Sequence, residues 1–263
     1  MSNNLEKVFD RPKSLKLTEF HYCPGCSHQI VHRLIAEIID ELGIQDRTIG
    51  IAPVGCAVLA YDYWDIDMSE AAHGRAPAVA TGIKRVHPDN IVFSYQGDGD
   101  LAAIGMAETI HAANRGEKIT VIFINNAIYG MTGGQMAPTT LPGQRTATTP
   151  YGREVDDVGY PIKMCELLAT LTTPAYIERV TVISPKHIAN TKRALKKAFL
   201  NQVKGLCYSF IEVVSTCPTG WGLSPVDAHQ WVNDNMLPYY ELGCKKDCLD
   251  PVVENENSSL SGY

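Results

Sequence analysis

The feature of this sequence that most restricts its fold is a pair of apolar, β-rich runs separated by a helical segment, with a polar turn after each run. The runs cover residues 91–96 and 120–124, and residues 101–115 between them are rich in Ala, contain no Pro and include a single Gly. This order predicts a strand, a helix and a parallel strand joined by a right-handed crossover. The turns at 97–100 and 125–126 are therefore expected on one edge of a sheet, where open α/β sheets bind ligands.

Polar residues in these two turns predict a magnesium site. Asp98 lies between Gly97 and Gly99, and Asn126 ends the second turn. The glycines allow the backbone to approach a ligand closely, and amide groups at the start of the following helix favour an anion. Because Mg²⁺ prefers oxygen ligands, Asp98 and Asn126 are expected to hold it against a bound diphosphate, with a backbone carbonyl or water completing its coordination. For the GDG sequence alone, the alternative is an ordinary tight turn.

Composition and charge are those of a soluble protein with one α/β domain. The 263 residues are 45% hydrophobic, and the net charge of −6 without any basic run argues against nucleic acid or an anionic membrane as partner. The N-terminus lacks the apolar run of a signal peptide, and no apolar window is long enough to span a membrane, so we expect a cytoplasmic protein. We expect an N-terminal arm at 1–20 that packs on a neighbour, a single domain at 21–243 and a disordered tail at 244–263.

Eight cysteines in such a chain favour metal or redox chemistry over a disulfide framework. Cys23 and Cys26 form a CxxC on a Gly/Pro turn, where two thiolates can bind one metal centre. The alternative is a thioredoxin-like redox pair, although the apolar strand that precedes such a pair is absent. Cys56 follows the strand predicted at 48–52, where a buried apolar cysteine is the alternative, and Cys217 follows the strand at 208–214. Cys165 and Cys207 lie in or beside apolar runs and are expected to be structural. Cys244 and Cys248 form a CxxxC pair in the polar tail and are weaker candidates for the same metal.

These segments together resemble the β subunit of the 2-oxoacid:ferredoxin oxidoreductases. The likeness covers residues 20–225 and rests on CPGCSH at 23–28, PVGC at 53–56, HGRAPAVATGIK at 73–84, the GDG turn, and NNAIYGMTGGQMAPTT at 125–140. The resemblance implies a mostly parallel α/β sheet flanked by helices, the diphosphate-binding half of the thiamine diphosphate fold. It also implies three cofactors: thiamine diphosphate, Mg²⁺ and a [4Fe-4S] cluster.

The resemblance also assigns residues to each cofactor. It gives the backbone carbonyl of Ile128 to Mg²⁺, beside Asp98 and Asn126. The implied cluster ligands are Cys23, Cys26, Cys56 and Cys217. The residues implied to bind or line the thiamine cofactor are Val54, Gly55, Cys56, Ala57, His73, Gly97, Gly99, Asp100, Gly130 and Met131.

Three side chains near the predicted site have ordinary alternatives. His73 is expected to face the diphosphate or the aminopyrimidine, but it can equally be a hydrogen-bonded structural histidine. Arg75 can bind phosphate or pair with a core carboxylate. Met131 can support the bent shape of the cofactor or pack in the core.

The implied activity is CoA-dependent oxidative decarboxylation. The thiamine carbanion adds to the keto carbon of a 2-oxoacid, CO₂ leaves, coenzyme A accepts the acyl group, and electrons pass singly through the cluster to ferredoxin. In this family the glutamate that activates the cofactor comes from a partner, so no catalytic residue is expected in this chain. We therefore expect activity only with an alpha-type subunit, with small gamma and delta subunits as further members of the complex.

The substrate is less constrained by the sequence. Some members of the family carry a basic residue near Gly133, and this chain does not. Its absence favours an apolar substrate side chain, unless the partner supplies an arginine. A branched-chain 2-oxoacid or 2-oxoglutarate is expected ahead of pyruvate.

Alternatives remain open on the sequence alone. One is a thiamine diphosphate-dependent decarboxylase or carboligase subunit without redox chemistry, and another is a Cys₄ zinc or iron–sulfur protein in which GDG is a mere turn. The helix predicted after Ser184 carries a basic face that is either solvated or docks an acidic ferredoxin. Residues 57–72 form either a cofactor-lining loop or a packed turn, and the polar stretch 141–160 is expected to be a functional or interface loop.

Overall fold

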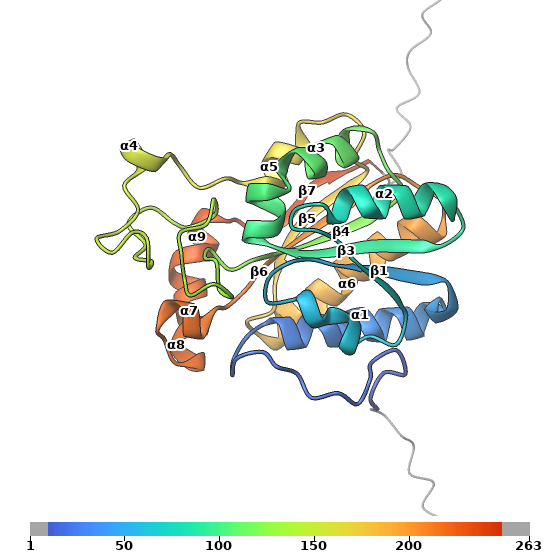
Figure 1. Ribbon diagram of the computed structural model, residues 1–263, viewed down its shortest axis with the longest axis horizontal. Helices are drawn as coiled ribbons and strands as arrows, with labels where there is room; N and C mark the ends of the chain where they lie inside the picture. The colour runs from blue at the N-terminus through green and yellow to red at the C-terminus, as the bar shows by residue number, and fades with distance from the viewer. Residues whose placement is uncertain (1–9, 249–263) are drawn as a thin grey trace, which may run out of the picture.

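The computed structural model describes residues 10–248, and its centre is a seven-stranded sheet (Figure 1). The strand order is β2-β1-β3-β4-β6-β5-β7, and every neighbouring pair is parallel except β5 with the edge strand β7. The mostly parallel α/β sheet expected from the sequence is therefore confirmed. The strands are β1 (Thr48–Ala52), β2 (Asp67–Glu70), β3 (Ile91–Gly97), β4 (Thr120–Asn125), β5 (Tyr176–Thr181), β6 (Ser209–Val214) and β7 (Gly243–Asp247).

Helices cover both faces of the sheet, which gives a three-layer structure. In Figure 1, α1 (His28–Leu42) and α6 (Pro185–Val203) lie on one face, and α2 (Ala76–Val86), α3 (Met106–Asn114) and α5 (Met164–Ala169) lie on the other. Among the described helices, none is long and apolar enough to cross a membrane.

Strand β3 shows why the sequence signal of the central strands is strong. Ile91, Phe93 and Tyr95 belong to the core shared with α1 and α6, whereas Val92 belongs to the core on the opposite face. A strand buried on both faces reads as a continuous apolar run instead of an alternating one. The same holds for β4, all of whose residues are buried.

The helix predicted after β3 is interrupted. A π-helical stretch, η3 (Gly99–Ile104), precedes α3, and Gly105 separates the two. A Cβ at Gly105 would lie 2.4 Å from the carbonyl oxygen of Asp100 and 2.6 Å from that of Gly74. The close contact with the Gly74 turn leaves no room for a side chain, and the helix changes its hydrogen-bond spacing there.

The two ends of the domain differ from the expectation in part. The described part of the N-terminal arm packs on its own chain, because Leu15 is buried beside Trp64 and the Ser14 hydroxyl donates to Asp40 over 2.5 Å; packing of the arm on a neighbour stays a prediction. The tail expected from residue 244 begins as part of strand β7, which pairs with β5. The rest of that tail and residues 1–9 lie outside the described residues.

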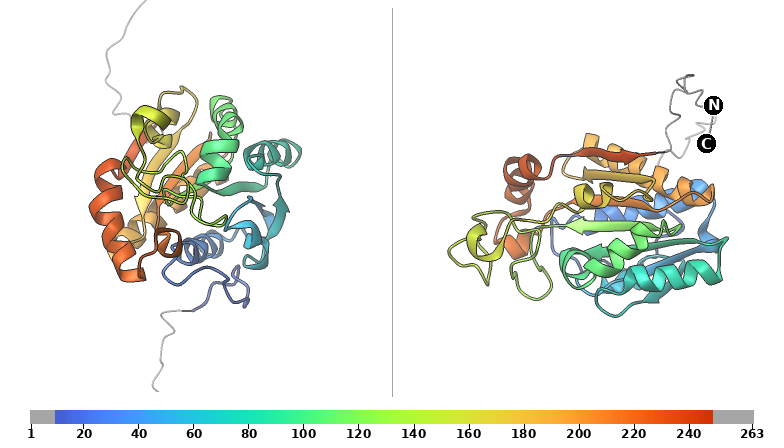
Figure 2. Two further views of the ribbon diagram at one scale, coloured as in Figure 1. Left: turned by 60° about the vertical axis from the view of Figure 1, so that its left-hand side comes forward. Right: turned by 90° about the horizontal axis from the view of Figure 1, so that it is seen from above.

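Residues 57–72 contain a short 3₁₀ helix, η2 (Val58–Asp62), and the edge strand β2. The two edge strands, β2 and β7, have no neighbouring strand on one side and are only partly buried, so neither has a strong apolar pattern. Two longer excursions lie beyond the carboxyl ends of the central strands (Figures 1 and 2). One contains the loop with α4 (Val155–Val158), and the other contains the short helices α7 (Pro218–Trp221), α8 (Pro225–Trp231) and α9 (Leu237–Tyr239).

Candidate functional site

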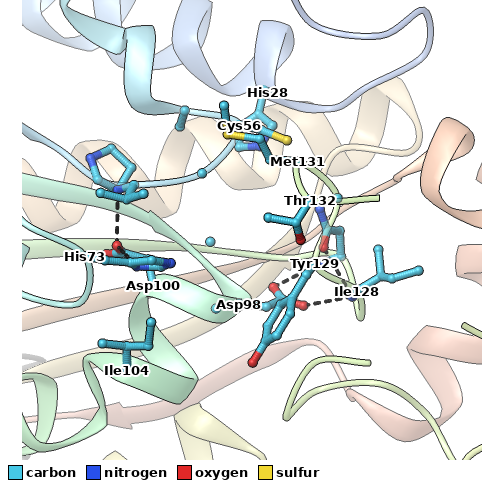
Figure 3. A pocket seen from close by; sticks show the side chains of 18 residues that line it. His28, Cys56, His73, Asp98, Asp100, Ile104, Ile128, Tyr129, Met131 and Thr132 are labelled. Carbon is cyan, nitrogen blue, oxygen red and sulfur yellow. Dashed lines mark hydrogen bonds and ion pairs between the residues drawn. The ribbon is translucent and has the colours of Figure 1, made fainter. Parts of the chain in front are cut away.

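One pocket opens at the carboxyl ends of β1, β3 and β4 (Figure 3). The three strands are parallel neighbours, so the turns that follow them meet on one edge of the sheet. Every residue that the resemblance assigned to the thiamine cofactor or to Mg²⁺ lines this pocket. The sequence analysis did not assign five further lining residues: His28, Pro53, Ile104, Tyr129 and Thr132.

Asp98 lies at the base of this pocket, and the segment after β4 turns back onto it. Its carboxylate accepts hydrogen bonds from the backbone N–H groups of Asn126 (3.2 Å) and Ile128 (3.1 Å) and from the Thr139 hydroxyl (2.5 Å). Residues 125–128, called the metal loop below, thus wrap around the carboxylate. Ala127 lies between the two backbone donors of this loop. Among the residues that the structure describes, it is the only non-glycine residue with a positive φ, which is 57°.

The surroundings of Asp98 fit a divalent cation. The residue is 2% exposed, and burial raises the pKa of its carboxyl group to about 7. No lysine, arginine or histidine of the described chain forms an ion pair with it, so the negative charge has hydrogen-bond donors but no neutralising cation. A bound metal ion would stabilise a buried carboxylate in this position.

Asp100, two residues further on, has a different role. Its Oδ1 accepts hydrogen bonds from the Val54 backbone N–H (3.1 Å), the Gly74 backbone N–H (3.0 Å) and His73 Nδ1 (2.7 Å), and its Oδ2 accepts one from Gln96 Nε2 (2.6 Å). One carboxylate therefore ties together the turn after β1, the His73 turn and β3. His73 is held by Asp100 and still lines the pocket (Figure 3), so the two interpretations of this histidine are compatible.

Two of the predicted cluster cysteines flank Gly130. A Cβ at this position would lie 3.1 Å from Cys217 Sγ and 3.5 Å from Cys56 Sγ. The turn that carries Cys23 and Cys26 is fastened to the Cys217 loop, because the Thr216 hydroxyl donates to the Gly25 carbonyl (2.7 Å). These contacts bring the CxxC turn, the end of β1 and the end of β6 to one place.

The thiols of this group influence one another electrostatically; Cys23 is exposed, whereas Cys26, Cys56 and Cys217 are partly buried. Burial, together with the nearby Cys217, Cys56 and Cys23 side chains, raises the pKa of Cys26 to about 12. Burial also raises the pKa of Cys217 to about 12. Such thiols ionise when a metal centre replaces their protons, so four of them around one space fit a cluster.

The zinc alternative gains no support from this geometry. Within residues 10–248, no three His, Cys, Asp or Glu side chains are placed to hold a single metal ion. A structural zinc site needs its ligands around one point, whereas each thiolate of a four-iron cluster binds a different iron.

The other four cysteines lie apart from the pocket or in the core. Cys165 is buried, and Cys207 is exposed before β6. Cys244 lies in β7, the strand at the end of the sheet opposite to β1, and Cys248 follows that strand. The sheet order thus separates the CxxxC pair from Cys56.

Contacts within the chain bear on three alternatives that the sequence left open. Met131 is 58% exposed and lines the pocket, so core packing is wrong for this residue. Arg75 forms an ion pair with Glu108 on α3 (2.8 Å) and does not line the pocket. Of the basic residues of α6, Lys192 pairs with Glu37 of α1 at 2.7 Å and Lys196 with Glu41 at 2.8 Å, which leaves that face with little free positive charge.

Comparisons with known proteins agree with this geometry. The family model of the thiamine pyrophosphate enzyme C-terminal TPP binding domain matches residues 54–213. The β subunit of a 2-oxoacid:ferredoxin oxidoreductase from Sulfolobus sp is 30% identical over 89% of this chain and 71% of its own length. The chain belongs to this oxidoreductase β-subunit family.

Other members of the family show the same relationship. The 2-oxoglutarate synthase subunit KorB of Methanocaldococcus jannaschii is 38% identical over 82% of this chain and 78% of its own length. A solved 2-oxoglutarate:ferredoxin oxidoreductase from Magnetococcus marinus matches with a TM-score of 0.73 and 26% identity over 87% of this chain and 74% of its own. The ketoisovalerate oxidoreductase subunit VorA of Methanothermobacter thermautotrophicus is 53% identical over 97% of this chain but only 54% of its own length. This chain spans about half the length of that relative.

Within this β-subunit family fold, the pocket residues that the sequence analysis missed carried weak signals. His28 belongs to the CPGCSH segment, and Tyr129 and Thr132 belong to the segment after β4, so position in a motif is a usable signal for them. Thr139, which donates to Asp98, lies 13 residues beyond Asn126 in the same segment, and only the folded loop brings it back.

Proposed function

We propose that this chain is the thiamine diphosphate-binding subunit of a 2-oxoacid:ferredoxin oxidoreductase. One observation supports this more than any other: Gly130 lies two residues after the metal loop and also between two of the predicted cluster cysteines. A Cβ there would contact Cys217 Sγ at 3.1 Å and Asn126 Nδ2 at 3.9 Å. A metal–diphosphate anchor directly beside four thiols is the arrangement that one-electron oxidation of a thiamine-bound substrate requires, and a non-redox decarboxylase needs only the anchor.

The residues of this chain would bind and orient the cofactors. Asp98, Asn126 and the Ile128 carbonyl would hold Mg²⁺, and Cys23, Cys26, Cys56 and Cys217 would hold a [4Fe-4S] cluster. When bound, thiamine diphosphate supplies the carbanion chemistry that decarboxylates a 2-oxoacid. Asp100 keeps the turns after β1 and β3 in register around the cofactor, and Met131 reaches into the open side of the pocket.

The pocket requires a partner chain. No glutamate lines it among the described residues, although thiamine catalysis needs a carboxylate against the aminopyrimidine. We therefore propose that an alpha-type subunit completes the site, with coenzyme A, a 2-oxoacid and ferredoxin as reactants. Small gamma and delta subunits are further proposed members. A cytoplasmic location is also proposed, because none of the eight cysteines, all of them in the described residues, forms a disulfide.

The proposed substrate is a branched-chain 2-oxoacid. The pocket is lined by no lysine or arginine of the described chain that would pair with a second substrate carboxylate. The identity to ketoisovalerate oxidoreductase subunits, 53% and 50%, also exceeds the 36–38% identity to four KorB subunits of 2-oxoglutarate synthases. 2-Oxoglutarate is the second candidate, because it is the substrate in the names of those relatives.

The experiment is reconstitution with the alpha-type partner. We expect bound iron, bound thiamine diphosphate and CoA-dependent reduction of a one-electron acceptor that is faster with 2-oxoisovalerate than with 2-oxoglutarate. Appreciable oxidation of a 2-oxoacid by the purified single chain would contradict the partner requirement. A thiamine-loaded complex without iron would point to the non-redox enzyme instead.

A further inference from the structure

A fully buried polar chain of residues runs behind the metal loop, from β4 through β6 to β5. Asn125, the last residue of β4, donates from Nδ2 to Glu212 Oε1 on β6 over 2.7 Å. The other carboxylate oxygen of Glu212 lies 2.9 Å from an NH2 nitrogen of Arg179 on β5. All three residues are 0% exposed. A buried ion pair is weak evidence for stability, because well-packed apolar side chains of similar volume are often at least as stabilising.

Asn125 connects this polar chain to the metal loop. Its Oδ1 accepts a hydrogen bond from the Ala127 backbone N–H (3.2 Å), so both ends of its side-chain amide are engaged. The carboxylate of Glu212 can only accept, and it therefore orients the amide with Nδ2 toward β6 and Oδ1 toward the loop. The bond from Ala127 to Oδ1 orients the peptide group between Asn126 and Ala127, and a second side-chain turn, in which Asn126 Oδ1 accepts from the Ile128 backbone N–H (3.3 Å), spans Ala127 itself. The φ of Ala127, 57°, is unfavourable for any residue with a Cβ.

The strained residue has a geometric consequence. With Ala127 in the left-handed region, the backbone N–H groups of Asn126 and Ile128 both point at the Asp98 carboxylate. An extended or right-handed Ala127 would turn Ile128 away from Asp98, and with it the carbonyl proposed to bind Mg²⁺. The left-handed turn is thus the step that shapes the metal site.

A second branch reaches Asp98 from the same region. Tyr240 donates from its hydroxyl to the Thr139 carbonyl (2.6 Å), and Thr139 donates to Asp98. The Arg179 guanidinium lies 5.3 Å from the Tyr240 ring centre. The Arg179 guanidinium also donates two hydrogen bonds to the Glu166 carboxylate of α5, at 2.7 and 2.6 Å, and this bidentate pair fixes its position. The polar chain is therefore anchored at its far end.

We propose that Glu212, held by Arg179, is a positioning residue for the metal loop: it fixes the Asn125 amide, which maintains the left-handed turn at Ala127 and so aims the Mg²⁺–diphosphate ligands. This inference rests on the proposed function of the pocket. It predicts that damage to the polar chain weakens metal-dependent cofactor binding more than it weakens folding. It further predicts that relief of the strain at Ala127 restores binding.

The test measures thiamine diphosphate affinity against Mg²⁺ concentration in the cofactor-stripped complex with its partner subunit, by calorimetry, beside the thermal unfolding temperature. Asn125→Ala should weaken Mg²⁺-dependent binding about 10-fold, the loss of about one hydrogen bond. Ala127→Gly alone should bind like wild type, because glycine adopts a positive φ freely. The double variant Asn125→Ala/Ala127→Gly should regain most of the lost affinity, and Glu212→Gln should be improved by Ala127→Gly in the same way.

Two further variants keep the test decisive. Asn125→Ser retains an oxygen that can accept from Ala127, so it should bind with intermediate affinity if Asn125→Ala does not fold. Glu178→Gln is the matched control. Glu178 lies on β5, the strand next to β6, and its buried carboxylate pairs with Arg193 of α6 at 2.8 Å. This substitution should leave the affinity unchanged.

Affinity that stays unchanged in Asn125→Ala, or that Ala127→Gly fails to restore, would overturn the inference while the proposed function stands. A wild-type complex that binds no thiamine diphosphate with Mg²⁺ would instead refute the proposed function.

Discussion

Asp100→Asn is the substitution that most directly tests the organisation of the pocket. The carboxylate is 2% exposed and accepts four hydrogen bonds, three on Oδ1 and one on Oδ2. An asparagine keeps one acceptor oxygen, but its amino group would face Gln96 Nε2, another donor. Gln96 can rotate its amide only by giving up the bond that its oxygen accepts from Ser94 (3.0 Å).

The magnitude follows from these contacts. A hydrogen bond to a charged acceptor contributes about 1.5–3 kcal/mol, and here one is lost and three are weakened. Since the site is buried, little solvent compensation is available, and we expect the free energy of unfolding to fall by about 3 kcal/mol.

Urea unfolding of the purified chain, with linear extrapolation to water, measures this change. Asp46→Asn, at an exposed position, is the matched surface control and should change stability by less than about 0.5 kcal/mol. If Asp100→Asn were as mild as this control, the assignment of Asp100 as the residue that joins the three turns would be wrong.

Three further predictions concern neighbouring positions. Because burial raises the pKa of Asp98 to about 7, the folded metal-free chain binds the Asp98 proton more tightly than the unfolded chain does. The free energy of unfolding should therefore fall as pH rises from about 4 to 7, by up to about 1.4 kcal/mol per pH unit. Urea titrations of Asp98→Asn should lack this slope. Gly130→Ala should lower the iron content per chain, while its free energy of unfolding stays within about 1 kcal/mol of wild type. Gly82→Ala, where the added Cβ meets open space, should keep its iron. Equal iron contents in the two variants would show that a Cβ at residue 130 does not crowd Cys56 and Cys217. Gly105→Ala should lose about 3 kcal/mol in urea unfolding, because its Cβ would meet backbone and not a movable side chain, and a neutral result would contradict the close approach of the Gly74 turn.

The central strands and the pocket edge could be predicted because their signals are local. Residues 91–96 and 120–124 read as strands since both faces of β3 and β4 are buried, and the two polar turns then had to meet on one edge of a parallel sheet. The edge strands could not be recognised in the same way. Strand β2 is DMSE and β7 is GCKKD, and such short polar segments become strands only because a neighbouring strand offers unpaired backbone groups.

By itself, then, the sequence determined the fold class, the place of the pocket and the residue types around it, because periodicity, glycine positions and motif spacing are properties of the chain in one dimension. Only the tertiary structure decided which partners each polar group has. Arg75 pairs with Glu108, Asp100 ties three turns together, and Asn125 meets Glu212 across 87 residues of sequence. Such pairings depend on which buried faces come into contact, and hydrogen bonds act over about 3 Å, a distance that no pattern along the chain encodes.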